Sequence, residues 1–381
     1  MGRIAQPLLG VTVAHVGHHD PGYSRNRILA KALTRAGASV VQVTDRRRFA
    51  ARTLPLVRRA YAANPDVILV GVPGHSDLGA AKVVSMARGA PVLFDALIPL
   101  WEANVLDRRA VPARSLAARR YHLTDLVACF LADTVLTDTA AHAEWLREEF
   151  GLPASKLRRI WVGADDELMT PCDPPPPRAG ECRVFFYGSF IPLHGIEHII
   201  GAAALLDEVD DAVRFVLCGY GQTHRAMRQL AADTGVSNIE FLRPVATPEL
   251  RQLICDSDIC LGIFGTNPKA GRVIPNKLFD ALACRRPVIT ADTPAARECL
   301  SDGETAKLCP AGDPGALADA IATLRADASL RCRIATAGHE LFRRRFSLEA
   351  LAADVGQLIL ETAEGPSRPT GAALRGRSSG R

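Results

Sequence analysis

The stretch RVIPNKLFDALACRRPVIT, residues 272–290, predicts a loop, a helix and a strand in direct succession. Asn276 is the expected N-cap of the helix, because its side chain can accept a hydrogen bond from a free backbone N–H group. Ile274, Leu278 and Leu282 recur every four residues and form one apolar stripe. The helix is therefore expected to pack against a sheet.

The end of the same stretch predicts a buried strand. Arg285 and Arg286 are expected in the last turn of the helix, where cations suit the helix dipole. Residues 287–290 form a short β-branched run, which is typical of a strand buried in a parallel sheet. A helix that leads directly into such a strand indicates an α/β fold.

Lys277 stands at the start of the predicted helix. The open N-terminus of a helix offers backbone N–H groups, and a lysine adds a cation, so together they suit a diphosphate. The alternative is a capped structural helix whose lysine lies in solvent.

The composition indicates a folded chain of two domains. The chain has 381 residues, and 48% of them are hydrophobic, which excludes a disordered protein overall. The formal net charge of +5 comes mostly from arginine pairs spread along the chain, such as Arg58 with Arg59 and Arg119 with Arg120. This scatter is a weak indication of anionic ligands or of a membrane surface.

The cysteines predict a reduced chain without a structural zinc. There are 10 cysteines, none in a C-x-x-C pair, and the close pair Cys255 and Cys260 has no matching second cluster. Four cysteines lie in apolar runs, where a free thiol behaves as a small hydrophobic side chain: Cys218, Cys260, Cys284 and Cys309. We therefore expect a cytoplasmic protein.

The first apolar run, Leu8 to Val16, is too short to span a bilayer and lacks a signal-peptide cleavage pattern. The chain is expected to be cytoplasmic, or peripheral at the inner face of the membrane.

Strands and helices alternate through most of the chain. Predicted strands include residues 39–43, 67–72, 91–94 and 134–137, and later 182–187, 213–218, 239–242 and 259–263. Helical patterns separate them, which predicts two Rossmann-like domains, each a doubly wound parallel sheet. In such sheets, ligands bind at the carboxyl ends of the strands.

The predicted domain boundaries follow changes in composition. Residues 1–173 form the first domain, 174–180 a proline-rich connector, 181–346 the second domain, and 347–364 a helix that could cross back to the first domain. Residues 365–381 are predicted to be a disordered basic tail. No aromatic residue interleaves with the charges of the tail, so we expect no binding to nucleic acid.

Five segments together resemble the family-four glycosyltransferases, a retaining family with the GT-B fold. They are IWVGADDELMTP (160–171), YGSFIPLHG (187–195), LCGYG (217–221), FLRPV (241–245) and FDALACRRPVIT (279–290). The resemblance spans nearly the whole chain and implies two facing Rossmann-like domains. It also implies transfer of a sugar from a nucleotide-diphosphate sugar to a hydroxyl acceptor, with retention.

The chain departs from the pattern of this family at three positions. Ser189 and His194 stand where the family often has Arg and Lys, and Arg272 replaces the first of two acids. A subgroup with a Pro-x-Lys helix start makes a similar exchange, and this chain has Pro275 and Lys277. Lys277 is therefore the main catalytic candidate, as a cation that stabilises the departing diphosphate.

The resemblance implies a set of donor-binding residues. They are Gly188, Ser189, His194, Gly219, Arg243, Pro244, Val245, Val273, Ile274, Asn276, Lys277 and Asp280. Asp280 is expected to accept hydrogen bonds from the ribose, and its alternative role is that of a helix Asp paired locally or in solvent. We expect no metal and no cofactor, with the nucleotide sugar as co-substrate, because the sequence has no paired-carboxylate metal motif.

The first domain is expected to supply the acceptor side. His18, His19, Asp20, Tyr23 and Arg25 lie in or beside a loop after the first strand, and a polar solvent loop is the alternative. Asp95 directly follows the predicted strand 91–94, so it is the first-domain catalytic candidate, in a positioning role.

Two other classes of function stay open at this point. A sugar-nucleotide epimerase shares the architecture but needs convergent carboxylates and histidines. A non-catalytic two-domain binding protein would only close on its ligand. For the transferase, the expected partners are a nucleotide sugar and an acceptor that is a glycan, a lipid-linked glycan or a small molecule, with peripheral membrane contact through the arginine-rich surface.

Overall fold

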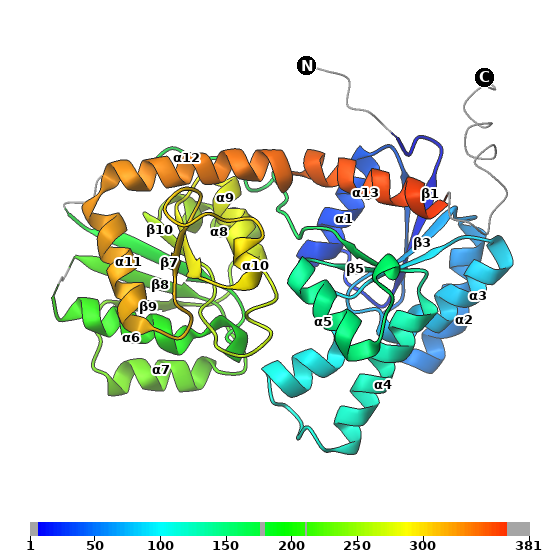
Figure 1. Ribbon diagram of the computed structural model, residues 1–381, viewed down its shortest axis with the longest axis horizontal. Helices are drawn as coiled ribbons and strands as arrows, with labels where there is room; N and C mark the ends of the chain where they lie inside the picture. The colour runs from blue at the N-terminus through cyan, green and yellow to red at the C-terminus, as the bar shows by residue number, and fades with distance from the viewer. Residues whose placement is uncertain (1–6, 176–179, 210–211, 364–381) are drawn as a thin grey trace. The chain divides into compact units, whose positions relative to one another are not determined.

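The computed structural model describes residues 7–175, 180–209 and 212–363, which form two compact units (Figure 1). The first unit comprises residues 1–103, 111–161 and 348–381, and the second unit comprises residues 104–110 and 162–347.

The first unit is built on a six-stranded parallel sheet with the strand order β2-β1-β3-β4-β5-β6. Its strands are β1 (Thr12–Gly17), β2 (Ser39–Thr44), β3 (Val67–Val70), β4 (Val92–Asp95), β5 (Thr134–Thr137) and β6 (Leu157–Arg159). Every residue of β3, β4 and β5 is buried, which explains their unbroken apolar runs. The predicted parallel sheet is confirmed.

Helices follow the strands of the first unit. They are α1 (Ser24–Arg35), α2 (Phe49–Ala62), α3 (Leu78–Arg88), α4 (Leu116–Leu131), α5 (Ala140–Phe150) and α13 (Leu348–Ala363). Shorter helices of this unit are the 3-10 helices η1 (His75–Asp77) and η3 (Ala154–Lys156). The π-helix η2 (Glu102–Asp107) begins in the first unit, and its residues 104–107 cluster with the second unit. In Figure 1, α13 lies beside α1, and Val355, Leu358 and Ile359 share an apolar region with residues of β1 and β3.

The second unit has its own six-stranded parallel sheet, with the order β12-β11-β10-β7-β8-β9. Its strands are β7 (Cys182–Tyr187), β8 (Val213–Cys218), β9 (Ile239–Leu242), β10 (Ile259–Leu261), β11 (Val288–Ala291) and β12 (Lys307–Cys309). Its helices are η4 (Pro192–His194), α6 (Ile196–Asp207), α7 (His224–Asp233), α8 (Thr247–Cys255), α9 (Asn276–Ala283), α10 (Pro294–Arg297), α11 (Pro314–Ala326) and α12 (Ala328–Arg345).

Helix α9 differs from its prediction at both ends. Pro275, with an extended backbone, is the N-cap, and Asn276 is the first helical residue, so its side chain caps nothing. The helix ends at Ala283, and Arg285 has a positive φ of 55° that ends helical geometry. Arg285 and Arg286 therefore follow the helix, rather than forming its last turn.

Gly195 separates the 3-10 helix η4 from α6. Gly195 has a φ of 62°, and a Cβ atom there would lie 2.4 Å from the backbone nitrogen of Gly265. Only glycine fits so close to another backbone. His194 therefore ends η4, and α6 starts beyond the glycine.

The segment 162–173, which the sequence analysis assigned to the first domain, clusters with the second unit. The Cys172 N–H group donates to the Cys284 carbonyl oxygen at 3.3 Å, and the Ala164 N–H group donates to Phe346 at 3.4 Å. Helix α13 clusters with the first unit. Part of the predicted connector, residues 176–179, and the whole predicted tail lie outside the described residues.

The structure contains a disulfide between Cys172 and Cys255, 83 residues apart. The sequence analysis predicted a reduced chain, and the fold brings together two cysteines whose spacing shows no motif. The four cysteines expected in apolar surroundings are free and buried. Among the described residues, none of the helices combines the length and apolar character needed to cross a bilayer.

Candidate functional site

A cavity of about 250 Å³ lies at the carboxyl ends of β7, β8 and β9 in the second unit. It is lined by Tyr187, Gly188, Ser189, Cys218, Gly219, Tyr220, Pro244, Val245 and Leu250. Five predicted donor-binding residues are thereby brought together: Gly188, Ser189, Gly219, Pro244 and Val245. Arg243 lines a neighbouring cavity with Tyr220 and His224.

Two glycines allow the loops after β7 and β8 to touch. Gly188 has a φ of 146° and Gly219 a φ of 157°. A Cβ atom at Gly219 would lie 1.9 Å from the Gly188 carbonyl oxygen, which is a direct clash with backbone. Glycine is therefore required at Gly219 for this loop arrangement.

Lys277 lies directly behind the Gly188 loop. Its Nζ atom is 3.1 Å from His194 Nε2 and 4.8 Å from the centroid of the Phe186 ring. A Cβ atom at Gly188 would lie only 3.1 Å from Nζ. Lys277 is 5% exposed, and burial lowers its pKa to about 7. In the part of the chain that the structure describes, no carboxylate forms an ion pair with it.

His194 is held as a neutral hydrogen-bond acceptor toward Lys277. Its Nδ1 atom donates to the Ser189 carbonyl oxygen, which leaves Nε2 free of a proton and directed at the ammonium group. Burial and the Lys277 charge lower the pKa of His194 well below its usual value. His194 and Lys277 are therefore in direct contact beside the Gly188 loop, and we call these two residues the lysine–histidine pair.

Asp280 lies one turn further along α9 and accepts a hydrogen bond from the Tyr187 hydroxyl group. Burial and the adjacent Asp280 raise the pKa of Tyr187 well above its usual value, so the hydroxyl group keeps its proton. Asp280 is 7% exposed. Tyr187 is therefore one hydrogen-bond partner of Asp280 in this structure.

The other predicted donor residues, which lie just before α9 or at its first position, differ in exposure. Val273 packs in a small apolar cluster with Leu193, Ile263 and Ala270. Ile274 is 3% exposed, whereas Asn276 is half-buried at the start of the helix.

Asp107 is a positioning residue that the sequence analysis missed. Its Oδ1 atom accepts from the Leu193 N–H group at 2.9 Å and from Asn267 Nδ2 at 2.9 Å. Both partners belong with Asp107 to the second unit. Asp107 thereby holds the loop that carries His194, and no local sequence signal marks a contact across 86 residues.

In the first unit, the two predicted residues Arg25 and Asp95 bind each other. Arg25 Nε donates to Asp95 Oδ2 at 2.8 Å, and Arg25 Nη2 donates to Asp95 Oδ1 at 3.2 Å. The other guanidinium nitrogen donates to the carbonyl oxygens of Ile160 and Trp161. Both side chains are fully buried. The pair therefore ties α1 to the end of β4 and to the segment after β6.

His18 lies beside the carboxylate of Asp77. The sequence analysis did not predict a role for Asp77. Asp77 accepts from the His18 backbone at 3.0 Å and lies 2.6 Å from His18 Nδ1, and Arg52 Nε donates to it at 2.8 Å. Burial opposes ionisation of Asp77, but the hydrogen bonds from His18 and Arg52 outweigh it and lower the pKa.

The remaining predicted acceptor-side residues differ in burial and in their contacts. His19 is buried and stacks on His15 with ring centroids 3.9 Å apart, and burial lowers its pKa. Asp20 forms an exposed ion pair with Arg46. Tyr23, 38% exposed, is the N-cap residue of α1.

A second polar cluster in the first unit follows β5. His142 Nδ1 lies 2.8 Å from Asp138, and His142 Nε2 lies 3.5 Å from Glu102. Burial alone would lower the pKa of His142, but the two carboxylates raise it to about 9. The sequence analysis did not predict this cluster, because Glu102 belongs to η2, which is far from His142 of α5 in the sequence.

Part of the chain is similar in sequence to known glycosyltransferases. Residues 181–327 match the family described as glycosyl transferases group 1. The chain is 30% identical over 203 residues to the phosphatidyl-myo-inositol mannosyltransferase of Mycobacterium leprae (strain TN), covering 52% of each protein. It is 30% identical over 246 residues to the D-inositol 3-phosphate glycosyltransferase of Corynebacterium glutamicum (strain R), covering 60% of this chain and 57% of that protein. The chain thus aligns with little more than half the length of these relatives.

Solved structures share the fold over most of the chain. Sucrose-phosphate synthase from Thermosynechococcus elongatus has a TM-score of 0.72 at 18% identity, covering 92% of this chain and 98% of that chain. Anabaena HepE, solved in complex with UDP-glucose, has a TM-score of 0.67 at 19% identity, with the same coverage. The predicted two-domain α/β fold of the GT-B type is confirmed.

Proposed function

We propose that this chain is a glycosyltransferase that moves a sugar from a nucleotide-diphosphate sugar to a hydroxyl acceptor. The group 1 family match over residues 181–327 and the named relatives support this activity. HepE was solved with UDP-glucose, which supports a uridine nucleotide sugar as the first donor to test.

The lysine–histidine pair is the observation that supports this function most. A buried ammonium group without a carboxylate partner is costly, and a bound anion compensates its charge. During sugar transfer, negative charge grows on the departing diphosphate, and a fixed cation stabilises it most in the transition state. Lys277 would supply this cation, and the Ser189 N–H group and the N-terminus of α9 would supply hydrogen bonds.

The cavity beside Gly188 suits the nucleoside part of the donor. Tyr220, Pro244 and Val245 offer apolar contact surface there. Asp280 is the proposed ribose contact of the sequence analysis, and a ribose hydroxyl group would have to share its carboxylate with Tyr187.

A nucleotide-sugar panel tests the activity. We would incubate the chain with UDP- and GDP-sugars, with and without hydroxyl acceptors such as inositol, and measure release of the nucleoside diphosphate. Release that depends on the acceptor supports transfer. Sugar isomerisation without acceptor would indicate an epimerase, and binding without turnover would indicate a binding protein. Anomeric analysis of the product by NMR tests retention.

We propose that transfer needs no metal ion, because the protonated Lys277 would supply positive charge where a metal could otherwise act. Turnover should persist in EDTA. Loss of turnover in EDTA that magnesium or manganese restores would contradict this part of the proposal.

We propose further that the chain uses the Pro-x-Lys helix start as its donor motif. Pro275 ends the extended segment before α9, which places Lys277 in the first turn of the helix. Pro275→Ala should weaken donor binding more than it weakens folding, whereas Pro294→Ala at the start of α10 is a matched control.

We also propose that the first unit docks on an anionic membrane through α4, from the cytoplasmic side. Leu116, Leu123 and Phe130 recur on one face of α4 and are 82%, 58% and 56% exposed. Arg119 and Arg120 are exposed beside this stripe. An apolar stripe flanked by arginines suits the surface of an anionic bilayer.

Vesicle sedimentation tests the docking surface. The chain should bind vesicles that contain anionic phospholipid and should bind zwitterionic vesicles less. Leu123→Asp should reduce binding, and Val209→Asp, an exposed apolar position of the second unit, should not. Equal binding by the wild type and Leu123→Asp would exclude α4 as the docking surface.

A further inference from the structure

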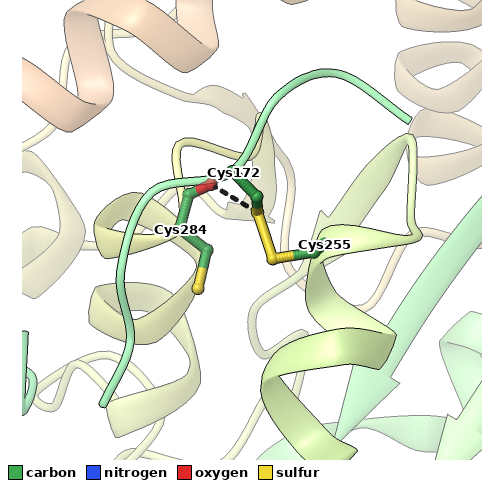
Figure 2. Close-up of side chains that lie close together, drawn as sticks. All are labelled: Cys172, Cys255 and Cys284. Carbon is green, nitrogen blue, oxygen red and sulfur yellow. Dashed lines mark hydrogen bonds between the residues drawn. A yellow bond between two sulfur atoms is a disulfide. The ribbon is translucent and has the colours of Figure 1, made fainter. Parts of the chain in front are cut away.

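Three cysteines from different parts of the chain meet in the second unit (Figure 2). Cys172 lies in the segment before the proline run, Cys255 is the last residue of α8, and Cys284 directly follows α9. Their sulfur atoms all lie within 4.8 Å of one another. Cys172 and Cys255 are joined in a disulfide, and Cys284 is a free buried thiol.

The backbone holds Cys172 next to Cys284 independently of the disulfide. The Cys172 N–H group donates to the Cys284 carbonyl oxygen at 3.3 Å, and the Cys172 sulfur lies 3.2 Å from the same oxygen. Arg285 reaches the Cys172 carbonyl oxygen at 3.4 Å, and Arg286 donates to the Asp173 carbonyl oxygen. The third thiol therefore stays close to the disulfide.

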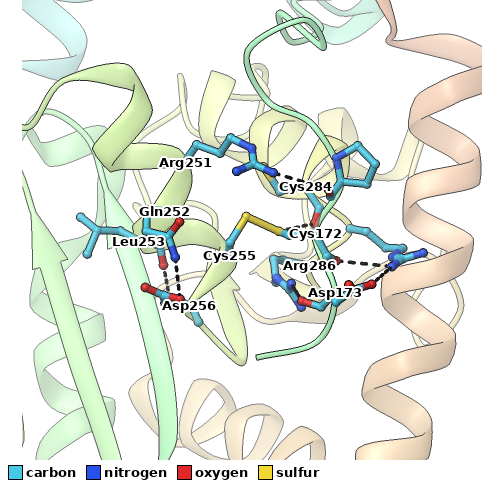
Figure 3. Close-up of a disulfide and its surroundings, with 12 residues drawn as sticks. Cys172, Asp173, Arg251, Gln252, Leu253, Cys255, Asp256, Cys284 and Arg286 are labelled. Atoms are coloured by element: carbon cyan, nitrogen blue, oxygen red, sulfur yellow. Dashed lines mark hydrogen bonds and ion pairs between the residues drawn. A yellow bond between two sulfur atoms is a disulfide. The ribbon is translucent and has the colours of Figure 1, made fainter. Parts of the chain in front are cut away.

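Arginine and aspartate side chains surround the disulfide, as Figure 3 shows. Arg251 donates to the Pro171 carbonyl oxygen at 3.5 Å. Arg251 Nε and Arg286 Nε are buried and have no hydrogen-bond acceptor among the described residues. Guanidinium groups stabilise a thiolate and disfavour a metal cation. Burial and the nearby Asp280 raise the pKa of the Cys284 thiol to about 12, and the charges of Arg251 and Arg286 oppose this rise. The two arginines therefore favour thiol chemistry over metal binding, and exchange through the Cys284 thiolate should be faster at alkaline pH.

We propose that Cys172, Cys255 and Cys284 form a thiol–disulfide exchange site, in which Cys172 can bond to either Cys255 or Cys284. In the exchange step, Cys284 loses its proton and its thiolate attacks the Cys172 sulfur. The Cys172–Cys284 bond forms, the Cys172–Cys255 bond breaks, and Cys255 leaves as a thiolate that takes up a proton. No electrons are gained or lost by the chain in this step.

The disulfide itself forms from two thiols when a small disulfide, such as oxidised glutathione, accepts two electrons and two protons and becomes two thiols. Cys172 is half-buried, whereas Cys255 and Cys284 are buried, so the small disulfide first reacts at Cys172. Exchange then moves the attachment of Cys172 from the end of α8 to the end of α9. Because α9 carries Lys277, the site connects the redox state of the chain to the donor-side helix.

Peptide mapping of the full chain tests this site. The chain is equilibrated in glutathione buffers from reduced to oxidised, acid-quenched, alkylated and digested without reduction. In oxidised buffer, the wild type should yield both Cys172–Cys255 and Cys172–Cys284 peptides, and in reduced buffer neither. A wild type that yields only the Cys172–Cys255 peptide overturns the exchange.

Serine variants sharpen the test. Cys255→Ser should form the Cys172–Cys284 disulfide, and Cys284→Ser should retain only Cys172–Cys255. Cys332→Ser, which removes the exposed cysteine, is the matched control and should behave as the wild type. Persistent glutathione on Cys172 in a folded Cys255→Ser chain, with Cys284 free, overturns the proposal. Uptake of Zn²⁺ by the reduced thiols without any disulfide formation in oxidised buffer also overturns it. These readouts do not depend on transferase activity.

Discussion

Buried cations near the carboxyl ends of the two sheets differ in whether a carboxylate binds them. In the first unit, Arg25 is bound by Asp95 and Arg52 by Asp77, so each guanidinium group already has a carboxylate. In the second unit, Lys277 faces a neutral histidine. A cation that the fold has already neutralised serves structure, whereas a cation left without a carboxylate is available to an anionic ligand. This difference supports the proposal that a diphosphate binds to the second unit.

The same comparison explains why the two edges should respond differently to mutation. Removing one member of a buried ion pair leaves the other charge uncompensated, which costs stability. Removing a buried cation that lacks a carboxylate relieves a desolvation cost and should affect ligand chemistry instead. The predictions below test this contrast from the largest expected effect to the smallest.

Asp95→Asn should cause the largest loss of stability. The substitution keeps the shape of the side chain but leaves the Arg25 charge buried without a carboxylate. We expect the free energy of unfolding to fall by about 3–5 kcal/mol, measured in urea. Asp20→Asn removes an exposed ion pair and should change it by less than about 1 kcal/mol. Equal effects of the two substitutions would mean that the buried pair has no special structural role.

Lys277→Ala should lower the rate of the chemical step by on the order of 10²-fold or more, because the cation acts where charge develops. Single-turnover rates and thermal stability are measured together. Lys277→Arg should restore part of the rate, since it keeps the charge but changes its shape and reach. Lys307→Ala, at a lysine paired with Asp302, is the control and should retain the wild-type rate. A normal rate in Lys277→Ala would place the diphosphate elsewhere.

Much of the fold and part of the site could be predicted from the sequence. The parallel sheets follow from local alternation, and the glycines after β7 and β8 stand at strand ends, where a local pattern already points to a ligand. The role of Asp107 could not be predicted, because it reaches Leu193 across 86 residues. The Arg25–Asp95 pair was also missed, since a strand-end carboxylate has the same local sequence whether it faces a ligand or an arginine.

The environment of α9 shows the same limit. The apolar stripe of α9 was predicted, but every residue from Lys277 to Ala283 is buried. The burial of the polar residues Lys277 and Asp280 depends on elements that are far away in the sequence. The disulfide between Cys172 and Cys255 likewise joins segments that only the folded chain brings together.

Tyr187→Phe should have a moderate effect on the second unit. The substitution removes the hydroxyl group that donates to Asp280 and keeps the ring. Because the lost hydrogen bond is to a buried acidic group, we expect the free energy of unfolding to fall by about 1.5–3 kcal/mol. Tyr61→Phe, at an exposed tyrosine of the first unit, should leave it unchanged within about 0.5 kcal/mol. If the two variants are equally stable, the Asp280 carboxylate finds another donor.

The pH dependence of stability should reveal the uncompensated charge of Lys277 directly. Burial lowers its pKa from 10.5 to about 7. Between these values the unfolded chain binds the proton that the folded chain has lost, so the stability of the folded chain rises with pH in this window. Below pH 7 both states are protonated, and Lys277 contributes no slope. The contribution is at most about 1.4 kcal/mol per pH unit. Other groups titrate as well, so the quantity to measure is the difference between the wild type and Lys277→Met in urea unfolding at pH 7–9.

Binding of a nucleoside diphosphate should raise the lowered pKa of Lys277 again. A bound anion compensates the ammonium charge and raises the pKa of Lys277, so binding takes up a proton above pH 7. The dissociation constant for UDP should therefore rise with pH in the wild type, by up to about tenfold per unit, and stay flatter in Lys277→Met. Lys307→Met should follow the wild type in both measurements. Parallel pH profiles for the wild type and Lys277→Met would show that Lys277 keeps its proton without a ligand, and the contrast between the two sheet edges would then not rest on charge.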